Sequence, residues 1–318
     1  MESAPVIISL GSINADFQVR AERWAEAGHD FLVTDFMRFG GGKAANVAYA
    51  ARRLGAPVML IGHVGDDDLA EQALNPLRQL PLDLRLVSRV HGMATGFVTI
   101  VVTPDGKKTM IAAHNANDVW TEKEAANAAS AVAKAAADSI LVADCAISID
   151  PVERAARAAV HRKFPIILDP SPAERVSDRL FPLVDFVTPN PVEAQQLTGI
   201  AVQSIEDALR AGRALISRGT KVALMKMPQG GCVIVTPDSA IAIRPAPVKV
   251  ADTTGAGDVF AAALAVALLE RQGLLDAVRF AAAAAHVSVT RYGAQTSYPD
   301  RTETEEMLAR LPSDEHIT

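Results

Sequence analysis

Two aspartates, Asp252 and Asp258, flank a run of threonine and glycine in the segment DTTGAGDVF. The glycines let the backbone approach a ligand closely, and the alanine-rich stretch that follows is typical of a helix. A glycine loop that opens a helix directs unpaired N–H groups and the positive end of the helix dipole at its surroundings. The segment therefore predicts an anion site with Asp258 at its rim.

Two roles for Asp258 are compatible with this position. It can act as a base that takes a proton from a hydroxyl group, which then attacks a phosphorus held by the loop. It can equally lie in the first turn of the helix and offset the dipole, and the spacing leaves both roles open. The chain has neither G-x-x-x-x-G-K-[ST] nor a G-x-G-x-x-G after its first strand, so neither a P-loop nor a Rossmann site is indicated.

A second set of polar residues lies in the segments GSINADF and GGGKAANVAYAARRLG. Asn14 and Asp16 follow the first predicted strand, and the carboxyl ends of strands are where open α/β sheets bind ligands. Lys43 and Asn46 lie on the first turns of a predicted helix. Together these groups offer the donors and acceptors that a polyol needs, although each alone is compatible with a cap or a turn.

The elements that must position these groups follow from the hydropathy pattern. Short apolar runs alternate with amphipathic alanine-rich segments, which predicts an α/β fold with a mostly parallel, doubly wound sheet flanked by helices, in one domain over residues 1–318. The predicted strands are 5–12, 58–65, 139–146, 165–171, 186–190 and 221–227. The predicted helices are 43–54, 68–80, 121–137, 151–163, 191–198, 205–218, 257–270 and 274–290.

Two segments, about 15–40 and 85–114, depart from this pattern. Their apolar and polar residues alternate, which predicts hairpin-like strands, and TPDGKK is a predicted turn in the second segment. Neither segment can bury both of its faces alone, so we expect them to combine into a small β lid. The alternative is an ordinary extension of the main sheet at its edge.

Composition excludes several classes of protein. The net charge is −6 and 49% of the residues are apolar, so neither nucleic acid nor an anionic membrane surface is expected as a partner. No apolar run reaches bilayer length, and the N-terminal segment is not typical of a signal peptide. The two cysteines, Cys145 and Cys232, are far apart and lack a C-x-x-C partner, so we expect a cytoplasmic protein without disulfides or zinc.

Five segments in order make the pattern specific: GSINAD, GGGKAANVA, TPNPVEAQQLTG, DTTGAGDVF and TRYGAQTSYP. In order and approximate spacing the chain resembles the ribokinase family, the PfkB-type sugar kinases, from Ile7 to about Pro299. The resemblance implies a ribokinase-like fold with a β lid and transfer of the γ-phosphate of ATP to a primary hydroxyl of a sugar, with Asp258 as the base. It also implies the cofactors ATP and Mg²⁺, K⁺ as an activator, and a homodimer formed through the lids.

The resemblance assigns roles to individual positions. The anion hole is Gly255, Ala256 and Gly257. The sugar contacts are Asn14, Asp16, Gly42, Lys43, Asn46 and Asp258. The ATP site comprises Asn190 and Glu193 of an N-x-x-E element near Mg²⁺ and the phosphates, Lys226, Gly231, Gly255 and Gly257. The monovalent cation site comprises Asp252, Thr254, Ser288, Arg291, Gly293 and Ser297.

Departures from the family pattern leave the substrate open. Where ribokinase proper has a sugar-contacting glutamate, this chain has Cys145 with Asp144 beside it, and Pro228 replaces the first glycine of the adenine-side turn. A nucleoside kinase is one alternative, because the lid segment offers aromatic side chains for stacking. These are Trp24, Phe31, Phe36 and Phe39. A catalytically silent sugar-binding relative is the other alternative.

Overall fold

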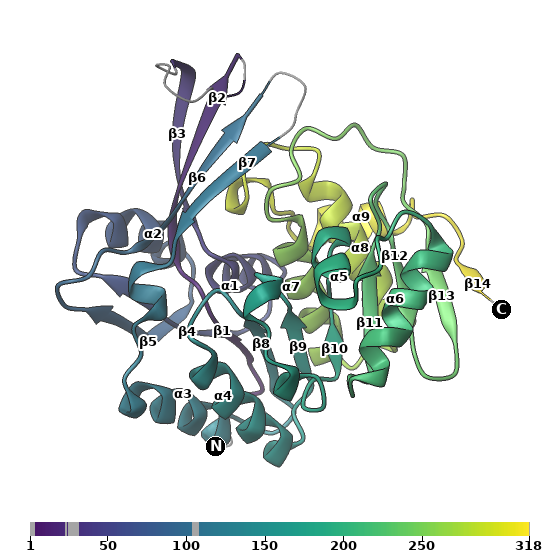
Figure 1. Ribbon diagram of the computed structural model, residues 1–318, viewed down its shortest axis with the longest axis horizontal. Helices are drawn as coiled ribbons and strands as arrows, with labels where there is room; N and C mark the ends of the chain where they lie inside the picture. The colour runs from purple at the N-terminus through teal and green to yellow at the C-terminus, as the bar shows by residue number, and fades with distance from the viewer. Residues whose placement is uncertain (1–3, 23, 25–31, 104–107, 318) are drawn as a thin grey trace.

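The computed structural model describes residues 4–22, 24, 32–103 and 108–317. Within these residues the strands form a ten-stranded sheet and a separate four-stranded sheet, which projects from the body of the molecule (Figure 1). The prediction of a mostly parallel α/β fold with a small β lid is confirmed.

The ten-stranded sheet has the order β14-β13-β12-β11-β10-β9-β8-β1-β4-β5. Its strands are β1 (Ile7–Leu10), β4 (Val58–Gly65), β5 (Asp83–Val90), β8 (Ile140–Asp144), β9 (Ile166–Asp169), β10 (Phe186–Val187), β11 (Val222–Lys226), β12 (Cys232–Val235), β13 (Ala240–Ile243) and β14 (Glu315–Ile317). Neighbours from β11 to β5 are parallel, and β12 to β14 continue the sheet antiparallel. The antiparallel strands are short and were not predicted.

Helices cover both faces of this sheet because its central strands are apolar on both sides. Ile7 and Ile8 of β1 are fully buried in two different clusters, one on each face. The helices are α1 (Lys43–Arg53), α2 (Asp68–Arg78), α3 (Glu122–Lys134), α4 (Ile149–Arg162), α5 (Pro191–Thr198), α6 (Ile205–Ser217), α7 (Ala256–Leu269), α8 (Leu274–Ser288) and α9 (Arg301–Leu308). All but α9 match predicted helices within a few residues.

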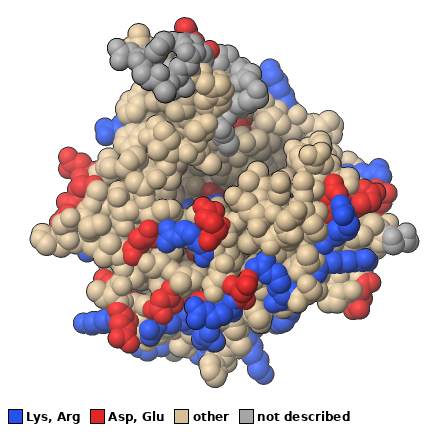
Figure 2. Space-filling view, viewed as in Figure 1, with Lys and Arg blue, Asp and Glu red and all other residues tan. Residues whose placement is uncertain are grey.

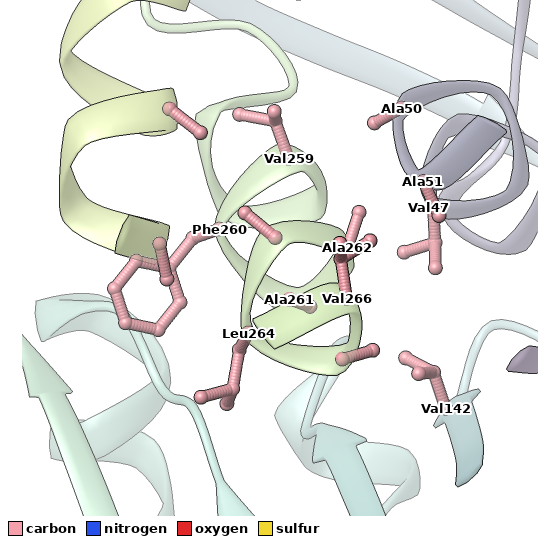
Figure 3. Packing of buried hydrophobic residues seen from close by; sticks show 14 of the residues in the cluster. Val47, Ala50, Ala51, Val142, Val259, Phe260, Ala261, Ala262, Leu264 and Val266 are labelled. Atoms are coloured by element: carbon pink, nitrogen blue, oxygen red, sulfur yellow. The ribbon is translucent and has the colours of Figure 1, made fainter. Parts of the chain in front are cut away.

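Helix α7 lies at the centre of the larger cluster. Its alanines let it approach α1 and the sheet closely, and Ala262 and Val266 point toward Val47 of α1 and Val142 of β8 (Figure 3). The helix is buried from Val259 to Ala267. Because α7 is held on every side, the loop at its N-terminus is presented at a fixed place.

The four-stranded sheet is the lid, in the order β3-β2-β6-β7. Its strands are β2 (Asn14–Ala21), β3 (Val33–Gly41), β6 (Gly96–Val102) and β7 (Lys108–Ala113). The two sequence-distant halves join through β2 and β6, which pair in parallel. The predicted second segment, 85–114, starts too early: residues 83–90 alternate like a lid strand but pair with β4 at the edge of the large sheet. The predicted turn at residues 104–107 lies outside the described residues.

Strand register gives the lid two different faces. Asn14, Asp16 and Phe39 share the face turned toward the body, where Phe39 lies close to Gly293. Phe17 shares the opposite face with Phe36, Phe97 and Ile111, and Phe17 stacks on Phe36 with ring centroids 5.8 Å apart. On this outer face the exposed fractions of Phe36 and Ile111 are 56% and 60%.

Among the described residues, no helix has both the length and the apolar character needed to cross a bilayer.

Candidate active site

The predicted site residues gather where the lid meets the body. The N-termini of α1 and α7 converge beneath the lid, next to the carboxyl ends of β8 and β9, and the surface is hollowed below the lid sheet (Figure 2). Lys43, Asp144, Asp169 and Asp258 line one cavity there. The topology therefore places the chemistry at the carboxyl edge of the parallel sheet.

Asp258 lies in the first turn of α7 and is buried. Its Oδ2 accepts a hydrogen bond of 2.7 Å from Nδ2 of Asn46, and its Oδ1 lies 3.7 Å from Nζ of Lys43. Burial raises the pKa of Asp258 above its ordinary value, while Lys43 and the hydrogen bond from Asn46 oppose that rise. A buried carboxylate held between a cation and an amide has the surroundings of a base.

The anion-binding loop is set by Gly255, the N-cap of α7, which adopts φ 75° and ψ 2°. A Cβ atom at this position would lie 2.2 Å from the hydroxyl of Tyr298, so the site excludes a side chain. No side chain caps the helix. The first-turn N–H groups, which include those of Gly257 and Asp258, therefore face the hollow and remain available to an anion.

Two lysines bring positive charge to this helix end. Nζ of Lys43 lies 3.3 Å from Oδ1 of Asp169, and Nζ of Lys226 lies 4.0 Å from Oδ2 of the same carboxylate. Nζ of Lys226 also lies 3.0 Å from where a Cβ of Gly257 would be. Burial alone would lower the pKa of Lys43, but the carboxylates of Asp169 and Asp258 outweigh it and raise that pKa. Both ammonium groups therefore stand beside the anion-binding loop.

The N-x-x-E element forms the N-terminus of α5. Oδ1 of Asn190 accepts from the N–H groups of Val192 and Glu193 at 2.9 Å each, and Glu193 Oε2 accepts from the N–H of Asn190 at 2.8 Å. The pair is thus a capping box. Glu193 is also buried, and burial together with Asp169 raises its pKa, against the two lysines. The N-x-x-E spacing therefore caps α5 and also places the carboxylate of Glu193 near Asp169 and the two lysines.

The predicted sugar residues surround the base of the lid. Oδ1 of Asp16 is buried without a hydrogen-bond partner, and burial followed by Asp258 raises the pKa of Asp16 to about 7. A Cβ on Gly41 would lie 2.1 Å from Oδ2 of Asp16, so the carboxylate occupies the space above that glycine. Gly42, with φ 92°, caps α1. A desolvated carboxylate oxygen without a hydrogen-bond partner, as Oδ1 of Asp16 is, suits contact with a hydroxyl group.

Asn14 is held by a residue from the segment AAHNAND. Nδ2 of Asn117 donates to Oδ1 of Asn14 over 2.8 Å, and Asn117 also bonds the backbone N–H and C=O of Ile13. Asn117 is fully buried. Asn117 therefore positions Asn14, one of the predicted sugar contacts.

The turn predicted to contact the nucleotide joins β11 to β12. Gly231 has φ 75°, its C=O accepts from the N–H of Met227, and a Cβ there would lie 2.2 Å from the carbonyl oxygen of Ile243. The turn keeps its second glycine for a steric reason. Pro228 lies at the tip of this turn and lines a surface pocket with Pro191.

The cation-site positions are brought together in part. Oδ1 of Asp252 accepts from N and Oγ1 of Thr254 at 2.8 and 2.7 Å, and its Oδ2 accepts from the N–H of Gly293 at 3.1 Å. This carboxylate joins the loop before α7 to the loop after α8. The remaining side chains point elsewhere: Ser288 and Ser297 donate to nearby backbone carbonyls, and Arg291 pairs with Glu303. Any ligand from these three positions is therefore a backbone group.

The two neighbours Asp144 and Cys145 have opposite surroundings. Cys145 is fully buried among apolar residues beneath α3 and α4, while Asp144 lines the cavity of Lys43. Asp144 accepts from the N–H groups of Ser12 and Ala146 at 3.0 and 2.8 Å, and burial raises its pKa to about 7. The acidic side chain at the end of β8 is thus Asp144, one residue before Cys145, where the family pattern has its glutamate.

Sequence reasoning missed two buried polar residues at the site. Asp169 lies between the two lysines at the end of β9, and an acid at the carboxyl end of a buried strand is the signal that could have found it. Gln295 lies in the 3₁₀ helix η4 (Gln295–Ser297), and its Nε2 donates to Oδ1 of Asn46 over 3.1 Å. Gln295 lies inside the segment TRYGAQTSYP, but nothing in that segment indicates its contact with Asn46.

In the part of the chain that the structure describes, no three His, Cys, Asp or Glu side chains are grouped to hold a metal ion. Asp169 and Glu193 nevertheless fit Mg²⁺, because both carboxylates are buried and hard cations take carboxylate oxygens. Oδ1 of Asp169 has the Lys43 ammonium 3.3 Å away but accepts no hydrogen bond. Two carboxylates suit an ion whose other ligands are phosphate and water.

A helix end and two cations gathered around a buried carboxylate suit phosphoryl transfer to a hydroxyl group, which is the chemistry of a small-molecule kinase. The chain matches the pfkB family carbohydrate kinase profile over residues 5–301, and it belongs to this family.

Individual relatives agree with this assignment. The ribokinase of Bacillus subtilis is 34% identical over 303 residues, which cover 95% of this chain and 99% of the relative. The ribokinase of Haemophilus influenzae is 32% identical over 299 residues, which cover 94% and 97%. The structure of Arabidopsis thaliana ribokinase complexed with ribose and ATP has a TM-score of 0.82 at 28% identity and covers 96% of this chain and 99% of that one. The chain is a sugar kinase of the ribokinase family.

The matches do not fix the sugar. A deoxyribokinase of Salmonella typhi is 26% identical over 304 residues, which cover 95% of this chain and 98% of that relative. Relatives acting on different pentoses therefore match the same length of chain.

Proposed function

We propose that this protein transfers the γ-phosphate of ATP to the primary hydroxyl of a pentose, with Asp258 as the general base. The observation that carries the proposal is the position of Asp258, buried 3.7 Å from the Lys43 ammonium in the first turn of α7. In that position it can take a proton from a hydroxyl while the adjacent helix end binds the phosphoryl group. Ribose is the first sugar to test, because the relatives from Haemophilus influenzae and Bacillus subtilis are both ribokinases.

In the proposed reaction the sugar lies beneath the lid. Asp16 and Asn14 on the inner lid face and Asn46 on α1 accept from and donate to its ring hydroxyls. The primary hydroxyl then lies against Asp258, which takes its proton as the oxygen attacks the γ-phosphorus. The amides of Gly255 to Gly257 and the ammonium of Lys226 stabilise the charge on the transferring group. The lid excludes water during transfer.

Two ions complete the proposal. Asp169 and Glu193 would hold Mg²⁺, which neutralises phosphate charge during transfer. The loop clamped by Asp252 would hold K⁺ next to the anion hole, mainly through backbone carbonyls. Turnover measured in K⁺ and in tetramethylammonium tests the second ion, and equal rates in the two salts would remove K⁺ from the proposal.

A nucleoside substrate is less well supported. Of the lid aromatics that favoured stacking on a base, Phe36 lies on the outer face and Trp24 is 38% exposed at the far end of β2. Phe31 lies outside the described residues. Of the described residues in this set, only Phe39 is on the inner face, beside Gly293, and one ring edge against a loop does not form a stacking pocket.

The test is ADP production from ATP with a panel of ribose, deoxyribose, fructose and nucleosides, for the wild type and Asp258→Asn. We expect turnover with a pentose and a loss of about 10²- to 10⁴-fold in kcat for Asp258→Asn, because the substitution keeps the shape but removes the base. A loss below about tenfold would reject Asp258 as the base. Turnover with nucleosides alone would reject the sugar.

We infer further that two copies pair through the outer faces of their lids. Phe17, Phe36, Phe97 and Ile111 form one apolar surface there. Helix α2 packs against the base of this face and the Arg38 guanidinium lies over the Phe17 ring, but Phe36 and Ile111 stay exposed. A second copy is the occupant because the same surface on each chain can pair about a two-fold axis.

Light scattering on size-exclusion fractions tests this pairing. We expect a dimer for the wild type and a monomer for Ile111→Glu, which places a charge on the apolar face. Val160→Glu on α4 is the control, because Val160 is 47% exposed and lies on a different element. A monomeric wild type, or a dimer unaffected by Ile111→Glu, would reject the lid as the interface.

A further inference from the structure

A chain of side-chain hydrogen bonds leads from the loop after α8 to Asp258. Nε2 of Gln295 donates to Oδ1 of Asn46 over 3.1 Å, and Nδ2 of Asn46 donates to Oδ2 of Asp258 over 2.7 Å. All three side chains are buried, so water does not compete for these bonds. The bonds join three elements: η4, α1 and α7.

The charge on Asp258 fixes the direction of every bond in this chain. An ionised carboxylate only accepts, so Asn46 must turn its NH₂ group toward Asp258. Its amide oxygen then faces Gln295, which must donate. If the donor of Gln295 were lost, the Asn46 amide could turn over and present its oxygen to the carboxylate, which would repel it.

We propose that Gln295 is a positioning residue for the phosphoryl transfer, acting on Asp258 through Asn46. By holding the oxygen of Asn46 it keeps the NH₂ group on Oδ2 of Asp258. The other oxygen, Oδ1, lies toward Lys43 and is left to take the proton of the sugar hydroxyl. This inference rests on the proposed role of Asp258 as the base.

Packing alone does not account for a glutamine here. Oε1 of Gln295 is buried without a hydrogen-bond partner, near the backbone of Gly40 in β3. A desolvated carbonyl of this kind is unfavourable, and a methionine of similar length would fill the space without it. What the glutamine adds over methionine is its donor, and that donor faces Asn46.

The loop of Gln295 has a second attachment that bears on its position. The N–H of Gly293, two residues earlier, donates to Oδ2 of Asp252 in the loop before α7. The same short segment therefore holds both the anion loop and the amide that orients the base.

The test is the pH dependence of kcat for Gln295→Met with the sugar found in the panel. The hydrogen bond from Asn46 favours the ionised form of Asp258, so its loss should move the acidic limb of the profile upward by about one pH unit. We expect thermal unfolding close to the wild-type temperature, because the variant removes one buried unpaired carbonyl, Oε1 of Gln295, and leaves another, Oδ1 of Asn46, without its donor. An unmoved limb would overturn the proposal.

Two further variants separate positioning from general damage. Gln72→Met is the matched control: Oε1 of Gln72 is also buried without a partner, but its Nε2 donates to backbone carbonyls of Asp16 and Phe39. It should leave the acidic limb in place. In an Asn46→Leu background, Gln295→Met should cause no further shift, because the contact it acts through is gone. A full shift in that background would overturn the proposal.

Failure of this inference is distinguishable from failure of the proposed function. If Asp258→Asn retains activity, Asp258 is not the base, and the proposed function fails whatever Gln295→Met does. If Asp258→Asn is inactive and Gln295→Met has the wild-type profile, only the role of Gln295 fails.

Discussion

The ammonium of Lys43 lies 3.7 Å from the carboxylate of Asp258, although the first residue opens α1 and the second lies in the first turn of α7. Two helix N-termini therefore converge on one point, and their dipoles add to the charge of the lysine. This positive field opposes the rise in the pKa of Asp258 that burial causes. The predictions below test the parts of that arrangement.

Lys43→Met should lower kcat/KM with the sugar by at least about 100-fold. The lysine opposes the burial that raises the pKa of Asp258, so its removal should also shift the acidic limb of the pH profile upward. Lys221→Met is the control, because Lys221 pairs with Asp185 at 2.6 Å on an exposed surface. Equal kinetic losses in both variants would contradict the specific role of Lys43.

Gly255→Ala should abolish most activity and destabilise the fold. The matched control is Gly199→Ala, because Gly199 has the same φ 75° and ψ 2° at the end of α5 but no atom within 4 Å of its Cβ position. We expect a loss of about 1 kcal/mol in the unfolding free energy for Gly199→Ala from the left-handed backbone alone. Gly255→Ala adds the clash with Tyr298 and should lose about 3 kcal/mol, together with about 100-fold in kcat. Urea unfolding and initial rates measure both quantities, and equal stability losses would reject the steric argument.

Glu193→Gln should change Mg²⁺ dependence while leaving α5 intact. Glutamine can keep the capping box, so unfolding should shift by less than about 0.5 kcal/mol. The loss of negative charge beside Asp169 should raise the Mg²⁺ concentration for half-maximal rate by about tenfold. Glu124→Gln, in the capping box of α3, provides the control. An unchanged Mg²⁺ titration would mean that Glu193 serves the helix alone.

Asp16→Asn should stabilise the free protein at alkaline pH and weaken sugar binding. The pKa of Asp16 is raised to about 7 in the fold, so the native state holds its proton more tightly than the unfolded chain does. Native stability is therefore lost as pH rises from about 4 to 7, and the variant escapes this loss. We expect roughly 4 kcal/mol of added stability at pH 8 and none below pH 4. Calorimetry across this pH range measures the difference, and a gain that is constant with pH would contradict it.

The parallel core of the fold was predictable because its signals are local. Apolar runs such as 140–144 are buried on both faces, and the helices between them carry amphipathic patterns and caps. The edge strand over residues 83–90 was assigned to the lid because alternation looks the same in any half-exposed strand. Only its pairing with β4 shows that this strand belongs to the large sheet and not to the lid.

The site was predictable where a motif carries a backbone requirement. Gly255 and Gly231 are such positions, because each has a positive φ that other residues adopt only with strain. Gln295 was not predictable, because an amide acts through the partner it meets and Asn46 is 249 positions away. Asp169 was predictable, because the rule that identified Asn14 places ligands at the carboxyl ends of strands. If the rule is applied to every predicted strand, it also selects Asp169.

The attachment of the lid has a mechanical consequence. Oγ of Ser12, just before β2, accepts from the N–H of Lys43, just after β3, over 2.9 Å, and the N–H of Ser12 is itself bound to Asp144. The two strands that carry the inner face are thus tied together where they leave the body. In the proposed reaction these ties hold Asn14, Asp16 and Gly41 at a fixed spacing next to the body, so we expect the sugar contacts to keep their arrangement when the lid closes.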